Sequence, residues 1–454
     1  MKPITFRQAA QAVGSATELD GSFSEVCTDT RKITPGCLFI AIKGENFDGN
    51  DFAAKAVESG AQAVICERDC GLDSRQIVVE SSRKALLDLA GYYRSLFRIP
   101  VVGITGSVGK TTTKEMTHAV MSAKYNTLKN EGNLNNEIGV PLTLFRLEKS
   151  HEAAVIEMGM SGFDEISRMT KAVRPDAAII SNIGVSHIEK LGSREGILRA
   201  KLEILHGMSE KAPLILNGDD EMLVTVRPGA HPVIYYGIDN ENSLFKASDI
   251  TSKENETVLT VGFSGGSLRV SLPFTGRHNV YNALAAVAAG SLFGIEPGDA
   301  LEALKNYVPS GMRQRINKKS GITFIEDCYN ASPDSQAAAL SVLGEMKARR
   351  RIAVIGDMLE LGHVSEKAHY DVGVKAVENG IDALFTYGER SRQTAKAAAE
   401  CGVKTVESFD DKQELSKALE GFLKEDDAVL FKASRGMKLE DVIYSIYDYL
   451  DSRK

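Results

Sequence analysis

The stretch that decides the fold is GITGSVGKTTTKE, Gly103 to Glu115. It follows an apolar run, Ile99 to Val102, and it precedes a segment with helical spacing of apolar residues. A strand, a glycine turn and a Lys-Thr pair at a helix start are typical of a phosphate-binding loop, in which backbone N–H groups and the helix N-terminus face the phosphates. Lys110 would add a positive charge, and the Thr111 hydroxyl could hold Mg²⁺.

The spacing of this loop departs from the common pattern. A glycine is expected five positions before Gly109, but Ile104 stands there, so the loop is the shorter variant that runs from Gly106 to Thr111. A glycine turn with an incidental lysine is the alternative. The loop alone predicts a bound nucleotide phosphate and leaves open what the phosphate is for.

Composition restricts the class of protein. The 454 residues suggest roughly three domains. The chain is 43% hydrophobic and 25% charged, and its net charge of −7 argues against a broad nucleic-acid surface. No apolar run approaches the ~20 residues of a membrane span, and MKPITFRQAA lacks a signal-peptide core. The six scattered cysteines complete no zinc pattern, so we expect reduced thiols in a cytoplasmic protein.

Residues 1–98 are predicted to form a separate α/β unit, with strands at Cys37–Ile42 and Ala63–Cys66. The polar loop Lys43–Asp51 follows the first of these strands, where ligand sites of α/β proteins usually lie. Asp29 and Arg31 precede that strand. A turn with an exposed ion pair is the alternative for these two residues.

Residues 99–311 form the predicted central unit. The stretch KNEGNLNNEIGVPLTL is dense in asparagine, which suits a binding loop, although a turn-rich connection is the alternative. The apolar run Ala153–Ile156 predicts a buried parallel strand, and Glu157 at its carboxyl end is well placed to hold Mg²⁺. A solvated glutamate is the alternative. Residues 214–275 alternate as short β-strands do.

Three further features of the central unit carry candidate residues. A second strand, Ala177–Ile180, is followed by His187, which is either structural or a ligand. A helix predicted over Ser193–Met208 carries Lys201, and lysines on such helices are usually solvated. An alanine-rich helix starts near Asn279, which would act as its N-terminal cap.

Residues 312–454 form the predicted third unit, an open α/β sheet of dinucleotide-fold type. Its first strand, Ile322–Ile325, lies between Arg313 and Asp327. Later loops gather Glu360, His363, Glu366 and His369, and then Lys432, Ser434 and Arg435. The first group lacks an HExxH pattern, which disfavours a metal site there. The predicted fold class is therefore α/β, with three domains, a central P-loop-type parallel sheet with an added β-rich part, and a C-terminal Rossmann-like domain.

Several motifs, in this order, carry a resemblance to a known family. They are GSVGKTTTKE, EMGM, NIGVSH, AKLEI, GRHNVYN, MRQR, DCYNASP, GDMLELG and SRGMKLE. In these motifs the chain resembles the Mur ligases, the ATP-dependent amide-forming family of peptidoglycan precursor synthesis, in which the short phosphate loop is normal. Within the family it is most similar to the branch that adds D-alanyl-D-alanine to UDP-N-acetylmuramoyl-tripeptide, since the DNPR motif of the diamino-acid-adding branch is missing.

The resemblance implies a role for each matching position. ATP would be bound by Thr105, Gly106, Ser107, Val108, Gly109, Lys110, Thr111, Thr112, Asn282, Arg313 and Asp327. Mg²⁺ would be bound by Thr111, Glu157, His187 and Lys201, the last as a carbamate. The catalytic residues would be Lys110, Glu157, His187 and Lys201. The UDP-linked substrate would be bound by Asp29, Thr30, Arg31, Lys43, Gly44, Asn135 and Asn136. The dipeptide would contact Asn330 and Ser434.

The implied reaction activates a carboxylate as an acyl phosphate, which the amine of the dipeptide then attacks. Because two anions must meet in the first step, cations would neutralise the charge, and the third domain would close to exclude water. The resemblance further implies a cytoplasmic monomer of cell-wall synthesis that does not insert into membranes. The alternatives are another Mur-type amide ligase, diamino-acid-adding or folylpolyglutamate-synthetase-like, and a non-catalytic nucleotide-binding protein.

Overall fold

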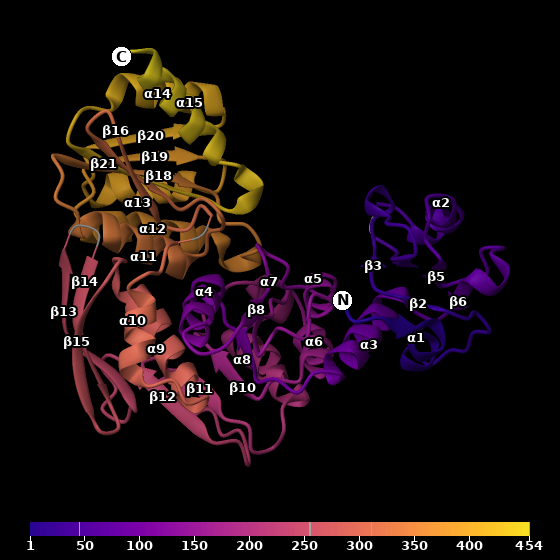
Figure 1. The fold of residues 1–454 in the computed structure, drawn as a ribbon. Helices are drawn as coiled ribbons and strands as arrows, with labels where there is room; N and C mark the ends of the chain where they lie inside the picture. Colours follow the sequence, from indigo (N-terminus) through magenta and orange to yellow (C-terminus); the bar gives the residue numbers. More distant parts are fainter. Residues whose placement is uncertain (45, 254–255, 310, 454) are drawn as a thin grey trace.

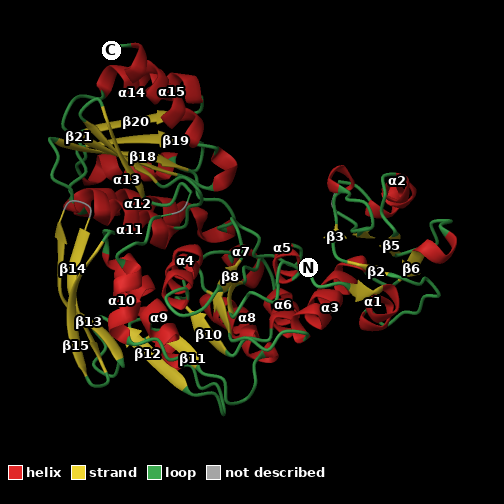
Figure 2. Ribbon diagram, in the orientation of Figure 1, coloured by secondary structure: helices red, strands yellow, loops and turns green. Residues whose placement is uncertain are grey.

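The computed structural model describes residues 1–44, 46–253, 256–309 and 311–453. Its chain forms a two-stranded, a four-stranded, a nine-stranded and a six-stranded sheet, with helices packed around the larger sheets (Figures 1 and 2). We call β1–α3 the first unit, β7–α10 the central unit and β16–α15 the third unit. The predicted α/β class is confirmed. Among the described residues, no helix combines the length and apolar character needed to cross a membrane.

The first unit contains the sheets β1-β2 and β3-β4-β5-β6, and the second of these is parallel. The predicted strands 37–42 and 63–66 are β4 and β5. Helix α3 joins this unit to the central one, since a Cβ added at Gly91 would lie 3.2 Å from the Cα of Ala172 on helix α6. The elements are β1 Ile4–Thr5, α1 Phe6–Ala12, β2 Ser22–Phe23, β3 Val26–Cys27, η1 Thr30–Lys32, β4 Leu38–Ile40, η2 Gly49–Phe52, α2 Ala53–Glu58, β5 Ala63–Cys66, η3 Asp73–Arg75, β6 Gln76–Val78 and α3 Ser82–Ser95.

The central unit is built on the nine-stranded sheet, in the order β15-β14-β13-β12-β11-β10-β7-β9-β8. Strands β8 to β12 and β7 pair in parallel, whereas β13, β14 and β15 form an antiparallel extension, so the added β-rich part is confirmed. Its elements are β7 Val101–Thr105, α4 Lys110–Met121, β8 Thr127–Lys129, α5 Gly139–Leu144, β9 Ala153–Glu157, α6 Glu165–Val173, β10 Ala177–Ile180, α7 Ile188–Leu191, α8 Arg194–Leu202, η4 Glu203–Gly207, β11 Leu214–Asn217, η5 Leu223–Thr225, β12 Val233–Gly237, β13 Phe245–Lys253, β14 Glu256–Phe263, β15 Gly266–Leu272, α9 Arg277–Leu292 and α10 Pro297–Leu304.

The middle strands of this sheet are apolar because both of their faces are covered. Ala154 and Ile156 of β9 face one hydrophobic core, and Val155 between them faces another. Helices α4 and α9 cover the second face and approach closely, since a Cβ at Gly290 would lie 2.5 Å from Val120 Cγ1. The alanine-rich sequence of α9 therefore serves close packing.

One predicted helix end and one predicted helix cap in the central unit are wrong. The helix predicted over 193–208 ends as α8 at Leu202, where the chain tightens into the 3₁₀ helix η4. Helix α9 starts at Arg277 with Gly276 as its N-terminal cap, so Asn279 lies inside the first turn instead of capping it. The Asn279 side chain is therefore free to donate a hydrogen bond to the carbonyl of Thr275, at 2.9 Å.

The third unit holds the six-stranded sheet, in the order β16-β17-β21-β18-β19-β20. All neighbours are parallel except the edge strand β16, which the sequence did not predict. The carboxyl ends of β17, β18 and β21 carry Asp327, Asp357 and Lys432. The elements are β16 Arg315–Lys319, β17 Ile322–Glu326, α11 Pro333–Glu345, β18 Arg350–Gly356, η6 Gly362–Val364, α12 Ser365–Glu378, β19 Ala383–Tyr387, α13 Arg392–Cys401, β20 Thr405–Phe409, α14 Lys412–Phe422, β21 Asp427–Lys432, η7 Arg435–Met437 and α15 Glu440–Ser452.

Candidate active site

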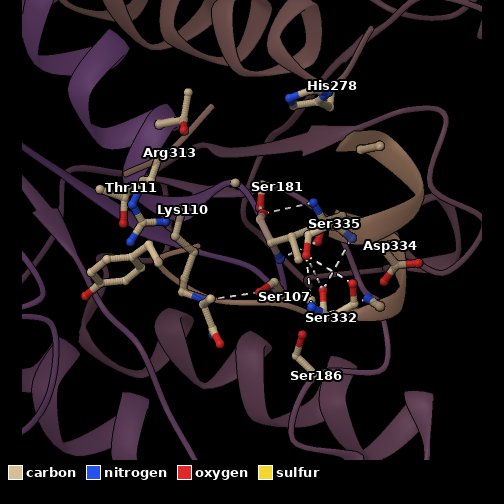
Figure 3. Close-up of a pocket in the computed structure, with 18 of the residues that line it drawn as sticks. Ser107, Lys110, Thr111, Ser181, Ser186, His278, Arg313, Ser332, Asp334 and Ser335 are labelled. Carbon is tan, nitrogen blue, oxygen red and sulfur yellow. Dashed lines mark hydrogen bonds between the residues drawn. The ribbon is translucent and has the colours of Figure 1, made fainter. Parts of the chain in front are cut away.

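A cavity of about 1110 Å³ lies between the central and the third units. Figure 3 shows part of its lining, with Lys110, Thr111 and Arg313 close together and the serines of the third unit beside Ser107. Predicted site residues from both units line it: Ser107, Val108, Gly109, Lys110, Thr111, Thr112, Asn135, Asn136, Glu157, His187, Asn282, Arg313, Asp327, Asn330 and Ser434. Residues as far apart in the sequence as Ser107 and Ser434 thus meet at one site.

The phosphate loop connects β7 to α4, and Asn182 braces it. The side-chain oxygen of Asn182 accepts a hydrogen bond from the backbone N–H of Val108 at 2.9 Å. Glycine is required at two positions: Gly109 has φ +81°, and a Cβ at Gly106 would lie 1.9 Å from Ser181 Oγ. Thr105 is the last residue of β7 and is buried. The loop geometry therefore follows from its glycines and from the neighbouring strand β10.

Lys110 is the first residue of α4, and its side chain curls back over the loop. Its Nζ donates hydrogen bonds to the carbonyl oxygens of Gly106 and Ser107, at 2.9 and 3.1 Å. Burial lowers the pKa of Lys110, while the nearby carboxylate of Glu157 acts in the opposite direction and the Arg313 guanidinium adds to the lowering. A cation held in this way is available to an anion that enters the cavity.

Glu157 is the last residue of β9, and only 1% of it is exposed, so the solvated alternative is wrong. Its Oε2 accepts a hydrogen bond from Thr111 Oγ1 at 2.9 Å, and its Oε1 accepts one from Asn135 Nδ2 at 2.7 Å. Lys114 Nζ lies 3.9 Å from Oε2. The buried carboxylate therefore lies directly beside the phosphate loop, and Asn135 approaches it from the asparagine-rich loop.

Lys201 on α8 is 1% exposed, so the solvated alternative is wrong here too. Burial lowers the pKa of Lys201 well below its ordinary value, and the charge of Lys110 lowers it further. Among the described residues, no hydrogen bond or ion pair reaches its amine. The lowered pKa favours the unprotonated amine, the form that can react with an electrophile such as carbon dioxide.

His187 joins the central unit to the third unit. Its Nδ1 lies 2.7 Å from Glu360 Oε2, and both residues have a positive φ, +64° and +63°. The hydrogen bond to His187 lowers the pKa of Glu360. The nearby His369 is buried and accepts a hydrogen bond from the backbone N–H of Met358, so it braces its own loop.

The remaining predicted nucleotide residues lie on both sides of the cavity. Asn282 on α9 accepts a hydrogen bond from Thr113 Oγ1 at 3.0 Å. The Arg313 guanidinium stacks on the ring of Tyr329, 4.0 Å from its centroid. Asp327 accepts a hydrogen bond from Lys432 Nζ at 2.6 Å. Each of these side chains is thus positioned by a contact with another residue of the protein.

The residues predicted in the first unit lie apart from this cavity. Asp29 forms an ion pair with Arg31 at 2.7 Å and caps η1, which begins at Thr30. Lys43 pairs with Asp48 in an isolated β-bridge, and the N–H of Gly44 donates to the Phe47 carbonyl at 2.9 Å. The exposed-ion-pair alternative therefore describes the local geometry of Asp29 and Arg31.

The two residues predicted for the dipeptide lie in loops of the third unit. Asn330 Oδ1 accepts a hydrogen bond from the N–H of Ala331 at 2.9 Å, and Ser434 Oγ accepts one from the N–H of Leu359 at 2.9 Å.

Sequence reasoning missed Asp334 and Gln314, which line the same cavity. Burial raises the pKa of Asp334, and a Cβ added at Gly184 would lie 2.1 Å from its Oδ2. The only sequence signal for Asp334 is its place in a helix start next to a predicted motif.

Comparisons with known proteins give the family. Three family models match consecutive parts of the chain: "Mur ligase family, catalytic domain" over residues 22–94, "Mur ligase middle domain" over 104–290 and "Mur ligase, glutamate ligase domain" over 312–435. A curated protein of Bacillus subtilis is 40% identical over 93% of both chains, and one of Escherichia coli is 38% identical over 99% of both. The chain belongs to the Mur ligase family. Both relatives are named UDP-N-acetylmuramoyl-tripeptide–D-alanyl-D-alanine ligase.

Solved structures of Mur ligases share the whole fold. MurF from Acinetobacter baumannii is 32% identical, with 99% of each chain covered and a TM-score of 0.91. MurF from Thermotoga maritima in complex with ADP is 29% identical, with 95% of this chain and 98% of that chain covered and a TM-score of 0.87. A folylpolyglutamate synthase of Mycobacterium tuberculosis, at 16% identity and a TM-score of 0.62, shares the fold alone.

Proposed function

We propose that this Mur ligase uses ATP to join D-alanyl-D-alanine to UDP-N-acetylmuramoyl-tripeptide. The observation that carries the proposal is that Lys110, the Thr111–Glu157 pair and Arg313 line one cavity between two units. The relatives that bear this activity in their names match over nearly the full length of the chain. Nucleotide use is further supported by the likeness to a MurF that was solved with ADP.

The reaction has two steps. A carboxylate oxygen of the tripeptide attacks the γ-phosphorus of ATP, the bond to the β-phosphate oxygen breaks, and ADP leaves. The free amine of the dipeptide then attacks the acyl carbon, phosphate leaves with the C–O bonding pair, and the nitrogen loses a proton as the amide forms. Lys110 and Arg313 would neutralise the charge that builds up on the transferred phosphoryl group, because two anions must approach each other.

The residues beside the phosphate loop fit Mg²⁺, which prefers oxygen ligands. Glu157 presents a buried carboxylate next to the Thr111 hydroxyl, and burial lowers the pKa of the Lys201 amine well below its ordinary value. We infer that Thr111 and Glu157 hold one Mg²⁺ and that His187 holds a second. A carbamylated Lys201 would serve as a further ligand, because a carbamate converts the amine into an oxygen donor. When bound, Mg²⁺ would supply neutralising charge to the phosphates.

We further propose that different parts of the chain bind different substrates. Residues 1–98 would bind the UDP part of the substrate through Asp29, Thr30, Arg31, Lys43 and Gly44, with Asn135 and Asn136 contributing from the central domain, 99–311. Residues 312–454 would bring Arg313 and Asp327 to the ATP and would hold the dipeptide near Asn330 and Ser434. The six free cysteines are consistent with a cytoplasmic location, and we propose a monomer that acts in cell-wall synthesis, and through it in cell shape and division.

A phosphate-release assay with ATP and the UDP-linked tripeptide tests the proposed function. We expect D-alanyl-D-alanine to stimulate release, and a single amino acid or glutamate to give none. Stimulation by a diamino acid or by glutamate would instead indicate another Mur-type ligase. ATP binding without any substrate-dependent release would indicate a nucleotide-binding protein. Running the assay with both the diaminopimelate and the lysine tripeptide would identify the third residue of the peptide.

A further inference from the structure

Gln314 lies where the chain enters the third unit, and its side chain reaches back into the central unit. Its Oε1 lies 2.8 Å from His278 Nε2 and 2.9 Å from Asn279 Nδ2. Its Nε2 donates to the carbonyl oxygen and the hydroxyl of Thr275, at 3.2 and 3.1 Å. Because a carbonyl oxygen can only accept, the amide nitrogen must face Thr275, and this orientation leaves the amide oxygen for the two donors on α9.

The backbone of Gln314 points the other way, into the third unit. Its N–H donates to Asp327 Oδ1 at 3.2 Å, while Asp327 Oδ2 accepts from Lys432 Nζ at 2.6 Å. The residue has φ +52°, a left-handed conformation that is uncommon for a side chain of this type. The surrounding hydrogen bonds therefore hold Gln314 in a conformation that it would rarely adopt alone.

These bonds make Gln314 part of a continuous hydrogen-bond network along the cavity wall, between the third and the central units. Asn279 Oδ1 accepts from Asn282 Nδ2 at 3.1 Å, and Asn282 Oδ1 accepts from Thr113 Oγ1 at 3.0 Å on the helix of the phosphate loop. Hydrogen bonds thus run from Asp327 through Gln314 and the two asparagines to α4. Arg313 precedes Gln314 directly, and its guanidinium lies close enough to Lys110 for their charges to interact.

We propose that Gln314 is a positioning residue that fixes the entrance to the third unit so that Arg313 faces the phosphate loop. The inference rests on the proposed function, in which Arg313 neutralises the transferred phosphoryl group. Arg313 carries the charge and its guanidinium stacks on the Tyr329 ring. Gln314 sets the backbone from which the arginine extends. Loss of the Gln314 amide would leave the arginine present but poorly placed.

The kinetic test compares Gln314→Ala and Gln314→Gly with Arg313→Ala and with the double variant Arg313→Ala/Gln314→Ala. Gly favours the left-handed backbone that Ala disfavours, so the pair separates the side-chain contacts from backbone strain. We expect kcat to fall about tenfold in both Gln314 variants with KM for ATP changed by less than about threefold. In the double variant, we expect kcat no lower than in Arg313→Ala alone. Gln413→Ala, on the exposed face of α14, is the matched control.

Two outcomes of the kinetics would overturn the proposal. One is a normal kcat in Gln314→Gly, which would assign the whole effect to the backbone. The other is a multiplicative loss in the double variant, which would mean that Gln314 acts independently of Arg313. Thermal melting of each variant separates these outcomes from a general loss of stability.

A second measurement does not depend on turnover. Hydrogen exchange of the purified full-length chain should become faster in residues 275–282 and 312–316 in both Gln314 variants, and should stay unchanged in Gln413→Ala. Unchanged exchange in the Gln314 variants would overturn the proposal even if the wild type were active. An inactive wild type with faster exchange in the variants would instead disprove the proposed function and leave the Gln314 contact intact.

Discussion

The Nδ1 atom of His187 lies 2.7 Å from Oε2 of Glu360, so a predicted metal ligand of the central unit is held by a carboxylate of the third unit. The Glu360 side chain is 62% exposed and the His187 side chain 23% exposed, so water reaches the carboxylate side of the contact. We expect a ligand that needs the histidine to compete with this contact. It links the arrangement of the two units to the availability of His187.

Glu360→Ala should lower the Mg²⁺ concentration needed for half-maximal phosphate release, by about two- to threefold, because one competitor for His187 is removed. Small-angle scattering of the nucleotide-free variant should show a more extended molecule. Glu366→Ala is the matched control, since Glu366 is an exposed glutamate of the neighbouring helix. A raised or unchanged Mg²⁺ requirement in Glu360→Ala would contradict the competition.

Lys110→Ala should reduce substrate-dependent phosphate release by about 10²–10³-fold or more, because the phosphoryl group would lose one of the two cations proposed to neutralise it. Lys171→Ala, on the exposed side of α6, should keep normal turnover. The measurement is the coupled phosphate-release assay under saturating ATP. Near-normal turnover of Lys110→Ala would rule out the proposed role of the phosphate loop.

Lys201→Ala should be inactive and should regain part of its activity when short carboxylic acids such as acetate or propionate are added. The buried space left by the lysine can accept a carboxylate in place of the carbamate. Rescue should be absent in Lys110→Ala, where a different group is missing. Mass analysis is a poor test because carbamates are labile, and a complete lack of rescue by any acid would argue against carbamylation.

The stability of the protein should depend on pH through Lys201. Its pKa in the folded chain lies well below the value of about 10.4 expected when unfolded, so between these values only the unfolded chain holds the proton. Stability from this group therefore rises with pH across that window. Lys201→Met should melt at a higher temperature than the wild type near neutral pH, in buffer free of carbon dioxide and Mg²⁺, and the difference should shrink toward pH 10. An equal melting temperature of Lys201→Met and the wild type at every pH would show that the buried amine does not destabilise the folded chain.

Local sequence patterns were sufficient for much of the fold. The glycines of the phosphate loop, the apolar runs of β9 and β10 and the strand-end position of Glu157 were all predicted, because each depends on neighbours within a few residues. Helix ends were predicted less well. The start of α9 depends on Gly276, and the end of α8 depends on a switch to 3₁₀ geometry that leaves no periodic signal.

The sequence by itself determined the α/β units and the phosphate loop, together with a short list of polar residues at strand ends. Only the tertiary structure decided that Lys201 is buried with a lowered pKa, that His187 meets Glu360 and that Gln314 bridges two units. The physical reason is that periodicity reports which face of a single element is apolar. Burial of a cation and contact between distant loops arise only when separate sheets pack against each other, and local periodicity does not encode that packing.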